Sequence, residues 1–157
     1  MWRNESGRGA WVVVSMLMMM TFVSCAGSKP ENLGVKEGRL APCPSSPNCV
    51  CSDDGGSGRG IAAIELAISP KKAWPIVVEV VYEMDRTTVI RDDEGYLHAE
   101  VASAIFGYVD DLELQLRAKQ HEIAVRSASR MGWSDMGVNR RRVESIRKKL
   151  VERGVAR

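Results

Sequence analysis

Histidine is scarce in this sequence, and the scarcity removes several kinds of catalytic and metal site. His98 and His121 are the only two histidines among 157 residues. Neither belongs to a His-x-x-Glu-His type of zinc motif, and no Gly-x-Ser-x-Gly segment is present to hold a nucleophilic serine. The sequence therefore carries no known catalytic signature, and we expect neither a metal nor any other cofactor.

The sequence also lacks an apolar run long enough to cross a bilayer as a helix. Its longest run covers residues 10–23, which is fourteen residues against the roughly twenty that a spanning helix needs. Arg3 and Arg8 precede this run and small residues close it, an order typical of an export signal, which we assign to residues 1–24. An ordinary cleaved signal and an uncleaved anchor are the alternatives.

The end of this signal, Phe-Val-Ser-Cys at residues 22–25, resembles the lipobox of bacterial lipoproteins. We therefore expect palmitate or a similar acyl chain on Cys25, and attachment to the membrane through this lipid anchor. Ala26 is not the Asp that would favour the inner membrane, so the outer membrane is expected if the cell has two. Residues 25–40 are polar and contain several glycines, and we expect them to form a flexible tether.

Cys43, Cys49 and Cys51 lie close together after this tether. Thiols of an exported protein tend to oxidise. A Cys43–Cys49 bridge closing a proline-stiffened loop is the first choice, and Cys43–Cys51 is the second. A metal site would need more ligands, because three cysteines without a nearby histidine form an incomplete set. Residues 41–60 are thus interpreted as a cysteine-containing loop segment within a single globular domain over residues 41–157.

The patterning of apolar residues predicts an α+β domain. The expected elements are a strand at 61–68, a helix at 70–84, strands at 87–91, 96–103, 110–117 and 122–129, and a helix from Asn139 to Gly154. Ser69 and Pro70 indicate the first helix start, and Asn139 is expected to be the N-cap of the second helix. This order, β-α-β-β-β-β-α, predicts an antiparallel sheet of about five strands with two helices packed on one face.

The strand expected at 110–117 separates charged from apolar side chains by face. Three leucines on one face alternate with Asp111, Glu113 and other polar residues on the opposite face. The strand at 122–129 alternates in the same way. Antiparallel pairing of the two strands would therefore place Arg126 and Arg130 near Asp111 and Glu113.

The net charge of +2 conceals two oppositely charged segments. Residues 92–122 contain eight acidic and two basic residues, whereas residues 126–157 contain ten basic and three acidic residues. The two segments can neutralise each other in the fold, or the second can form an anion-binding face. Nucleic acid is not expected as a partner, because the export signal directs the chain away from it.

Three consecutive arginines lie where the last helix begins. Arg140, Arg141 and Arg142 would meet the positive end of the helix dipole, which disfavours each by roughly 0.3–1 kcal/mol. We therefore expect negative charge nearby. It can come from internal acids, namely Asp110, Asp111, Asp135 and Glu113, or from a bound phosphate or carboxylate held by guanidinium and helix N–H groups. A solvated basic face is the third possibility.

Three separated motifs resemble the domain of unknown function 1499 family: residues 42–49 (Pro-Cys-Pro-Ser-Ser-Pro-Asn-Cys), 106–113 and 126–142. The similarity spans roughly residues 40–150. The family commonly occurs on exported, lipid-anchored or membrane-associated proteins, in agreement with the N-terminal segment, and it implies no particular activity. Ser is more usual in the family at the position of Cys51, which supports Cys43–Cys49 as the bridge.

We thus expect a non-catalytic envelope lipoprotein whose arginine-rich loop binds an anionic ligand or an acidic protein partner. The candidate site residues are Arg126, Arg130, Asp135, Asn139, Arg140, Arg141, Asp110, Asp111 and Glu113. One alternative is an enzyme that acts on an anionic substrate, with His98, Glu100, Asp111 and Glu113 as acid or base groups. In another, the charged residues form only a polar core.

Overall fold

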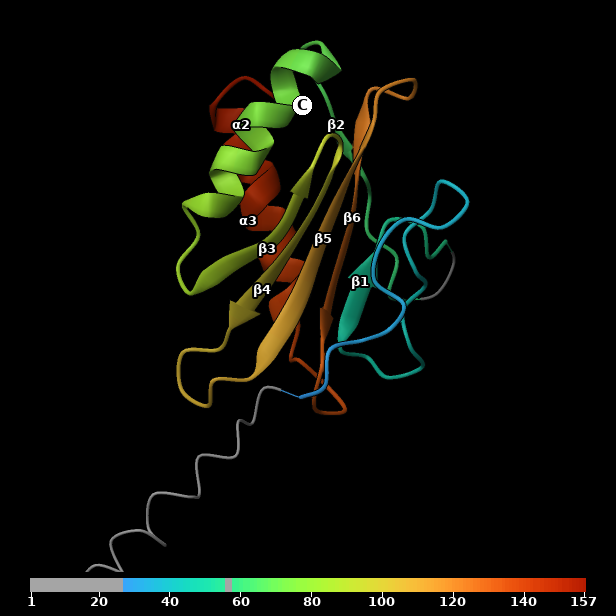
Figure 1. Ribbon diagram of the computed structural model, residues 1–157, viewed down its shortest axis with the longest axis vertical. Coiled ribbons are helices and arrows are strands. Elements are labelled where there is room, and N and C mark those ends of the chain that lie inside the picture. Colours follow the sequence, from blue (N-terminus) through green and yellow to red (C-terminus); the bar gives the residue numbers. More distant parts are fainter. Residues whose placement is uncertain (1–26, 56–57) are drawn as a thin grey trace, which may run out of the picture.

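The computed structural model describes residues 27–55 and 58–157, and its elements carry the labels of Figure 1. Six strands are present: β1 (Cys49–Cys51), β2 (Ile64–Glu65), β3 (Thr87–Asp93), β4 (Tyr96–Ala102), β5 (Val109–Arg117) and β6 (Glu122–Ser129). Two helices, α2 (Pro70–Tyr82) and α3 (Val138–Glu152), complete the fold. The predicted α+β class is confirmed, whereas the expected signal and Cys25 lie outside the described residues.

The strands form one antiparallel sheet in the order β1-β6-β5-β4-β3, and β2 also pairs with β6. The four strands β3 to β6 match the predicted ones to within two residues. The strand predicted at 61–68 is much shorter, because only Ile64 and Glu65 pair with β6. Strand β1 was expected to be loop. Its three residues are too few for a pattern, and they are extended because Cys49 pairs with Ala128, far along the chain.

Both helices lie on the same face of the sheet, as predicted (Figure 1). Helix α2 begins at Pro70 after Ser69, and Pro75 lies inside it without ending it. The β-branched run at 76–81 is helical because α2 buries Val77, Val80 and Val81 in the core. Tertiary burial thus outweighs the preference of β-branched residues for strands.

The core lies between these helices and the apolar face of the central strands. Leu112 and Leu114 of β5 are fully buried there, together with Val125 of β6 and Ile146 of α3. Each such side chain contributes about 1.5–3 kcal/mol when it leaves water. The alternation predicted from the sequence of β5 is therefore confirmed: its leucines face the core, and its polar side chains lie on the opposite face of the sheet.

The prediction that Asn139 caps α3 is wrong. Gly137 is the N-cap residue and has a left-handed backbone with φ of 79°. The carboxylate of Asp135 accepts hydrogen bonds from the backbone N–H of Gly137 (2.9 Å) and of Asn139 (2.7 Å). Asp135 therefore satisfies the N–H groups of the N-cap residue and of one residue in the first turn. Gly154 ends the helix with a φ of 69°, as predicted.

The segment expected to be a flexible tether makes defined contacts in its described part. We call residues 27–44 the strap, because this segment crosses the face of the sheet opposite the helices (Figure 1). Most of its side chains are exposed, as its composition predicts. However, the backbone N–H of Gly34 donates to Glu113 on β5 (2.7 Å), and Leu40 is buried with its N–H bound to Asp53 (2.8 Å). Backbone hydrogen bonds therefore hold a segment that has little apolar surface.

Candidate functional site

The polar residues of the central strands form a network on the face that the strap crosses. We call it the charged-face cluster. Its members are Tyr96, His98 and Glu100 of β4, Asp111 and Glu113 of β5, Arg126 of β6, and Arg130 just beyond β6. Alternate residues of a strand share a face, so this arrangement follows from the strand register.

Glu113 is the centre of the first half of the cluster. It lies opposite Arg126 in the strand register, and Arg126 Nη1 donates to its Oε2 at 2.9 Å. Its Oε1 accepts from the Tyr96 hydroxyl (2.8 Å) and from the N–H of Gly34 on the strap (2.7 Å). The side chain of Glu113 is 0% exposed and that of Arg126 is 3% exposed. This ion pair is therefore shielded from water and held at its register.

The hydroxyl of Tyr96 is a hydrogen-bond donor and not an activated nucleophile. Burial raises the pKa of Tyr96, and the negative charge of Glu113 raises this pKa further. The phenol therefore stays protonated at neutral pH.

Asp111 is the centre of the second half. Arg130 holds it with two parallel bonds, Nε to Oδ2 at 2.9 Å and Nη2 to Oδ1 at 2.7 Å. His98 Nε2 lies 2.8 Å from Asp111 Oδ1, and Glu100 accepts from Arg130 Nη2 at 2.5 Å. Burial alone would raise the pKa of Asp111, but the hydrogen bonds from Arg130 and His98 outweigh it and lower that pKa. Asp111 is therefore a structural carboxylate that remains ionised.

Two of the cavities along the strap have residues of the charged-face cluster in their walls. The first has a volume of about 430 Å³ between strap residues and the end of β6, and its sheet wall includes Arg126, Ser129 and Arg130. The second, of about 340 Å³, has Tyr96 and His98 in its wall. Among the described residues, nothing accepts a hydrogen bond from the buried Nε of Arg126. Arg126, whose Nε is buried and unsatisfied, is one of the residues that line the first cavity.

A second polar group connects the start of α3 to the sheet. Arg142 donates to Asp110 at 2.6 Å and to the hydroxyl of Ser127 at 2.9 Å. Asn139 accepts from Ser127 Oγ (2.6 Å) and donates to the carbonyl of Asn48 (3.0 Å). These residues lie on the helix-covered face, with Asn139 fully buried. We interpret them as the attachment of α3 to β6 and β1.

The arginines that the sequence grouped together are separated in the structure. Arg126, Arg130 and Arg142 pair with acids, as expected, but in two different clusters. Arg140 instead donates to the carbonyl of Gly60 (2.9 Å), and Arg141 donates to that of Met136 (2.9 Å). A single arginine-rich binding loop over these positions is therefore not formed.

Sequence reasoning omitted Tyr96 and Arg142 from the candidate site. Tyr96 had a usable signal, because it alternates with His98 and Glu100 on the polar face of a predicted strand. The position of the strap had no signal, because its bonds to the sheet use backbone groups that every residue carries.

The predicted Cys43–Cys49 disulfide is present, with a Cα–Cα distance of 5.6 Å. Cys51 is a free, buried thiol, and burial raises its pKa. Within residues 27–55 and 58–157, no group of three or more His, Cys, Asp and Glu side chains is arranged to hold a metal ion.

The structure thus defines a class: an α+β domain with two helices on one sheet face and a buried charged network, crossed by a strap, on the other. The chain belongs to the family described as "Protein of unknown function (DUF1499)", whose model matches residues 39–150. No curated protein and no solved structure matches the chain. In the described part of the chain, neither helix has the length and apolar character needed to span a membrane.

Proposed function

We propose that this protein is a lipid-anchored domain of the cell envelope that binds a small anionic ligand in the cavity between the strap and β6. The observation that carries the proposal is the guanidinium of Arg126, which lies in the cavity wall with its Nε lacking an acceptor. A buried donor without a partner costs about 1–3 kcal/mol. Because this Nε is shielded from solvent, a carboxylate oxygen that enters the cavity would supply the acceptor only after a local rearrangement of the cavity wall.

The charge balance of the cavity favours a ligand of low charge. Glu113, Asp111 and Glu100 together offset the charges of Arg126 and Arg130, so a multiply charged anion would meet no net positive potential. Arg140 and Arg141 lie outside this cavity, with their guanidinium groups bound to carbonyls. The charge balance therefore favours a small, singly charged carboxylate over an acidic protein surface as the partner.

The proposed attachment to the membrane is supported by the sequence of residues 10–25, in which a short apolar run ends at Cys25. Cys25→Ser should abolish metabolic labelling of the protein by palmitate. Unchanged labelling of this variant would refute lipidation at Cys25.

Ligand binding is tested by thermal unfolding of the full chain in detergent, at low salt, with acetate as the singly charged ligand and with succinate and inorganic phosphate as multiply charged comparisons. A ligand at one hundred times its Kd stabilises the native state by about 2.7 kcal/mol, which raises Tm by several degrees. Asn32→Trp fills the cavity from the exposed strap and should remove this shift. Val35→Trp, an exposed strap position outside the cavity wall, should retain it.

The absence of any anion-dependent Tm shift in the wild-type chain would overturn the proposal. An equal shift in the Asn32→Trp variant would place the ligand elsewhere on the protein and would also overturn this site.

A second candidate function is acid–base catalysis in the other cavity. The observation in its favour is the pair of His98 and Asp111, because a carboxylate 2.8 Å from a histidine nitrogen orients that ring. Its weakness is that Asp111 and Glu100 are both bound to Arg130. An activity found by substrate screening and lost in His98→Gln, but kept in Asn32→Trp, would favour the enzyme.

A further inference from the structure

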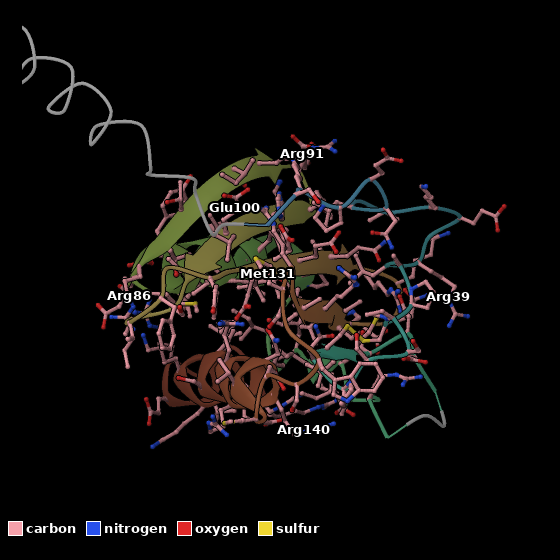
Figure 2. The ribbon with its side chains drawn as sticks, turned by 90° about the horizontal axis from the view of Figure 1, so that it is seen from below. Arg39, Arg86, Arg91, Glu100, Met131 and Arg140 are labelled. Atoms are coloured by element: carbon pink, nitrogen blue, oxygen red, sulfur yellow. A yellow bond between two sulfur atoms is a disulfide. The ribbon has the colours of Figure 1, made fainter. Side chains whose placement is uncertain are left out.

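Exposed apolar side chains gather at one end of the domain. Of the eleven large hydrophobic side chains exposed among the described residues, six lie in two loops, one between β4 and β5 and one between β6 and α3. These are Ile105, Phe106 and Tyr108 in loop 103–108, and Met131, Trp133 and Met136 in loop 131–137. We call these two loops the apolar end. Figure 1 places both at the same end of the sheet, and Figure 2 looks at that end with Met131 near its centre.

The loops are held together by the strands from which they emerge. Ala102 pairs with Val109 across β4 and β5, and the N–H of Arg130 donates to the carbonyl of Val109 at 3.1 Å. The apolar side chains nevertheless point into solvent, with Ile105 84% exposed and Trp133 72% exposed. A soluble monomer rarely exposes a contiguous apolar patch of this kind without a partner surface.

The charges around the apolar end are those that suit an anionic membrane surface. Loop 103–108 contains no charged residue, and loop 131–137 contains only Asp135, whose carboxylate is engaged at the start of α3. The adjoining groove is bordered by Arg86 and Lys149 and by one acid, Asp85, while Arg142 in its wall is paired with Asp110 (Figure 2 labels Arg86). Tryptophan and tyrosine are enriched where a protein meets the headgroup region, and each nearby basic residue adds attraction to anionic lipids.

The chain also enters the described fold at this end. Gly27 lies directly against the first residues after β6, since a Cβ placed on it would be 2.9 Å from Arg130 Cβ and 2.9 Å from Met131 Cγ. Two residues of chain span at most about 7 Å, so a lipid on Cys25 would lie within that reach of Gly27. An uncleaved anchor ending at Val23 would lie within about 14 Å. In either arrangement, the chain between the membrane attachment and Gly27 is too short to form a long flexible tether.

From these observations we propose that the apolar end is a membrane-docking surface, on which Ile105, Phe106, Trp133 and Met136 insert into the headgroup region of the bilayer that holds the chain. This inference rests on the proposed membrane attachment. The anchor fixes the distance of the domain from the bilayer, and the apolar end fixes its orientation. The strap and its cavities then lie along the side of the domain and not against the lipid.

The test uses the full chain in vesicles of phosphatidylethanolamine and phosphatidylglycerol, some with brominated acyl chains that quench tryptophan. The chain also contains Trp2, Trp11 and Trp74, so the emission of Trp133 is obtained by subtracting the emission of the Trp133→Phe variant from that of the wild-type chain. We expect brominated lipid to remove most of this difference signal. The matched control places a tryptophan at the opposite end, as Lys119→Trp in the Trp133→Phe background, and its added emission should survive.

The outcomes separate this inference from the proposed attachment. If the wild-type chain floats with the vesicles but the Trp133 signal is not quenched, or is quenched no more than that of Lys119→Trp, docking is overturned and attachment stands. If the chain does not float with the vesicles, both are overturned. If the Trp133 emission is unquenched and its maximum shifts with protein concentration, the apolar end contacts a second copy of the chain. This result would overturn our proposal.

Discussion

The two faces of this sheet are buried by different physical means. The helix-covered face excludes water with apolar side chains of α2 and α3, and the leucines of β5 are fully buried there. The opposite face excludes water with ion pairs and a strap that has few apolar side chains. Glu113 and Leu114 are neighbours in sequence, both are 0% exposed, and each lies on a different face.

The comparison shows that burial does not indicate which interaction stabilises a residue. An apolar side chain gains from leaving water wherever it packs well. A buried carboxylate loses its hydration and needs an ion pair and further hydrogen bonds to offset that loss. Glu113 has one guanidinium and two other donors, which is why it is tolerated at a fully buried position.

The largest effect is expected from Glu113→Ala, because it leaves the buried guanidinium of Arg126 without its acid. Removing one member of a buried pair costs about 3–5 kcal/mol of unfolding free energy, measured by urea denaturation. Exchanging the pair for apolar residues, as Glu113→Leu with Arg126→Met, should restore most of this loss. Exposed ion pairs contribute less than about 1 kcal/mol. If Glu113→Ala lowers the unfolding free energy by no more than this, the ion pair is not buried as described and the two faces do not differ in how they exclude water.

On the other face, Leu114→Ala should cost about 2–5 kcal/mol, because it leaves a cavity under the helices. The same urea titration measures this loss, and Leu114→Met is the conservative control, with an expected cost below about 1.5 kcal/mol. A loss in Leu114→Ala no larger than in its control would contradict close packing on this face.

Acid should weaken the charged face before the apolar one. The hydrogen bonds of Asp111 hold its pKa below the usual range in the folded protein. Its stabilising contribution is therefore present above the unfolded-state pKa of about 3.9, and is lost as the pH falls through the lower folded value. Urea unfolding of the wild-type chain should show falling stability below about pH 4. Asp111→Asn should flatten this dependence, whereas the exposed Asp92→Asn should retain it.

The smallest effect is expected from a change at Asp135, which caps the start of α3 on the helix-covered face. Asp135→Ala removes the acceptor of two backbone N–H groups and should cost about 1 kcal/mol, seen as a Tm lower by a few degrees. Asp135→Asn keeps one oxygen acceptor and should lose less. Equal losses in both variants would assign the effect to the charge of Asp135 at the helix dipole.

Sequence reasoning succeeded where a pattern is local and repeated. The alternation within residues 110–117 and 122–129 predicted both faces of the sheet and the approach of Arg126 and Arg130 to Glu113 and Asp111. That approach needed only the assumption of antiparallel pairing, because the register of two adjacent strands then decides which side chains meet.

Sequence reasoning failed for residues whose hydrogen-bond partners are distant in sequence and whose local pattern is typical of a different role. Asn139 is a residue type favoured at N-caps and precedes a helical apolar stripe, yet its side chain binds Ser127 and the carbonyl of Asn48. Arg140 and Arg141 were expected to lie near negative charge, from internal acids or a bound anion, but backbone carbonyls accept from them. A carbonyl belongs to every residue, so nothing in the sequence identifies which one will be used.

The last residue of the chain lies far from the first described one. Arg157 bonds to Glu65 near the end of the sheet opposite Gly27, and Figure 1 marks this terminus at the top of the domain. A fluorescent reporter or affinity tag appended after Arg157 would therefore project away from the apolar end. Such a fusion gives a natural position for imaging or purifying the intact protein without altering the surface that faces the lipid in our proposal.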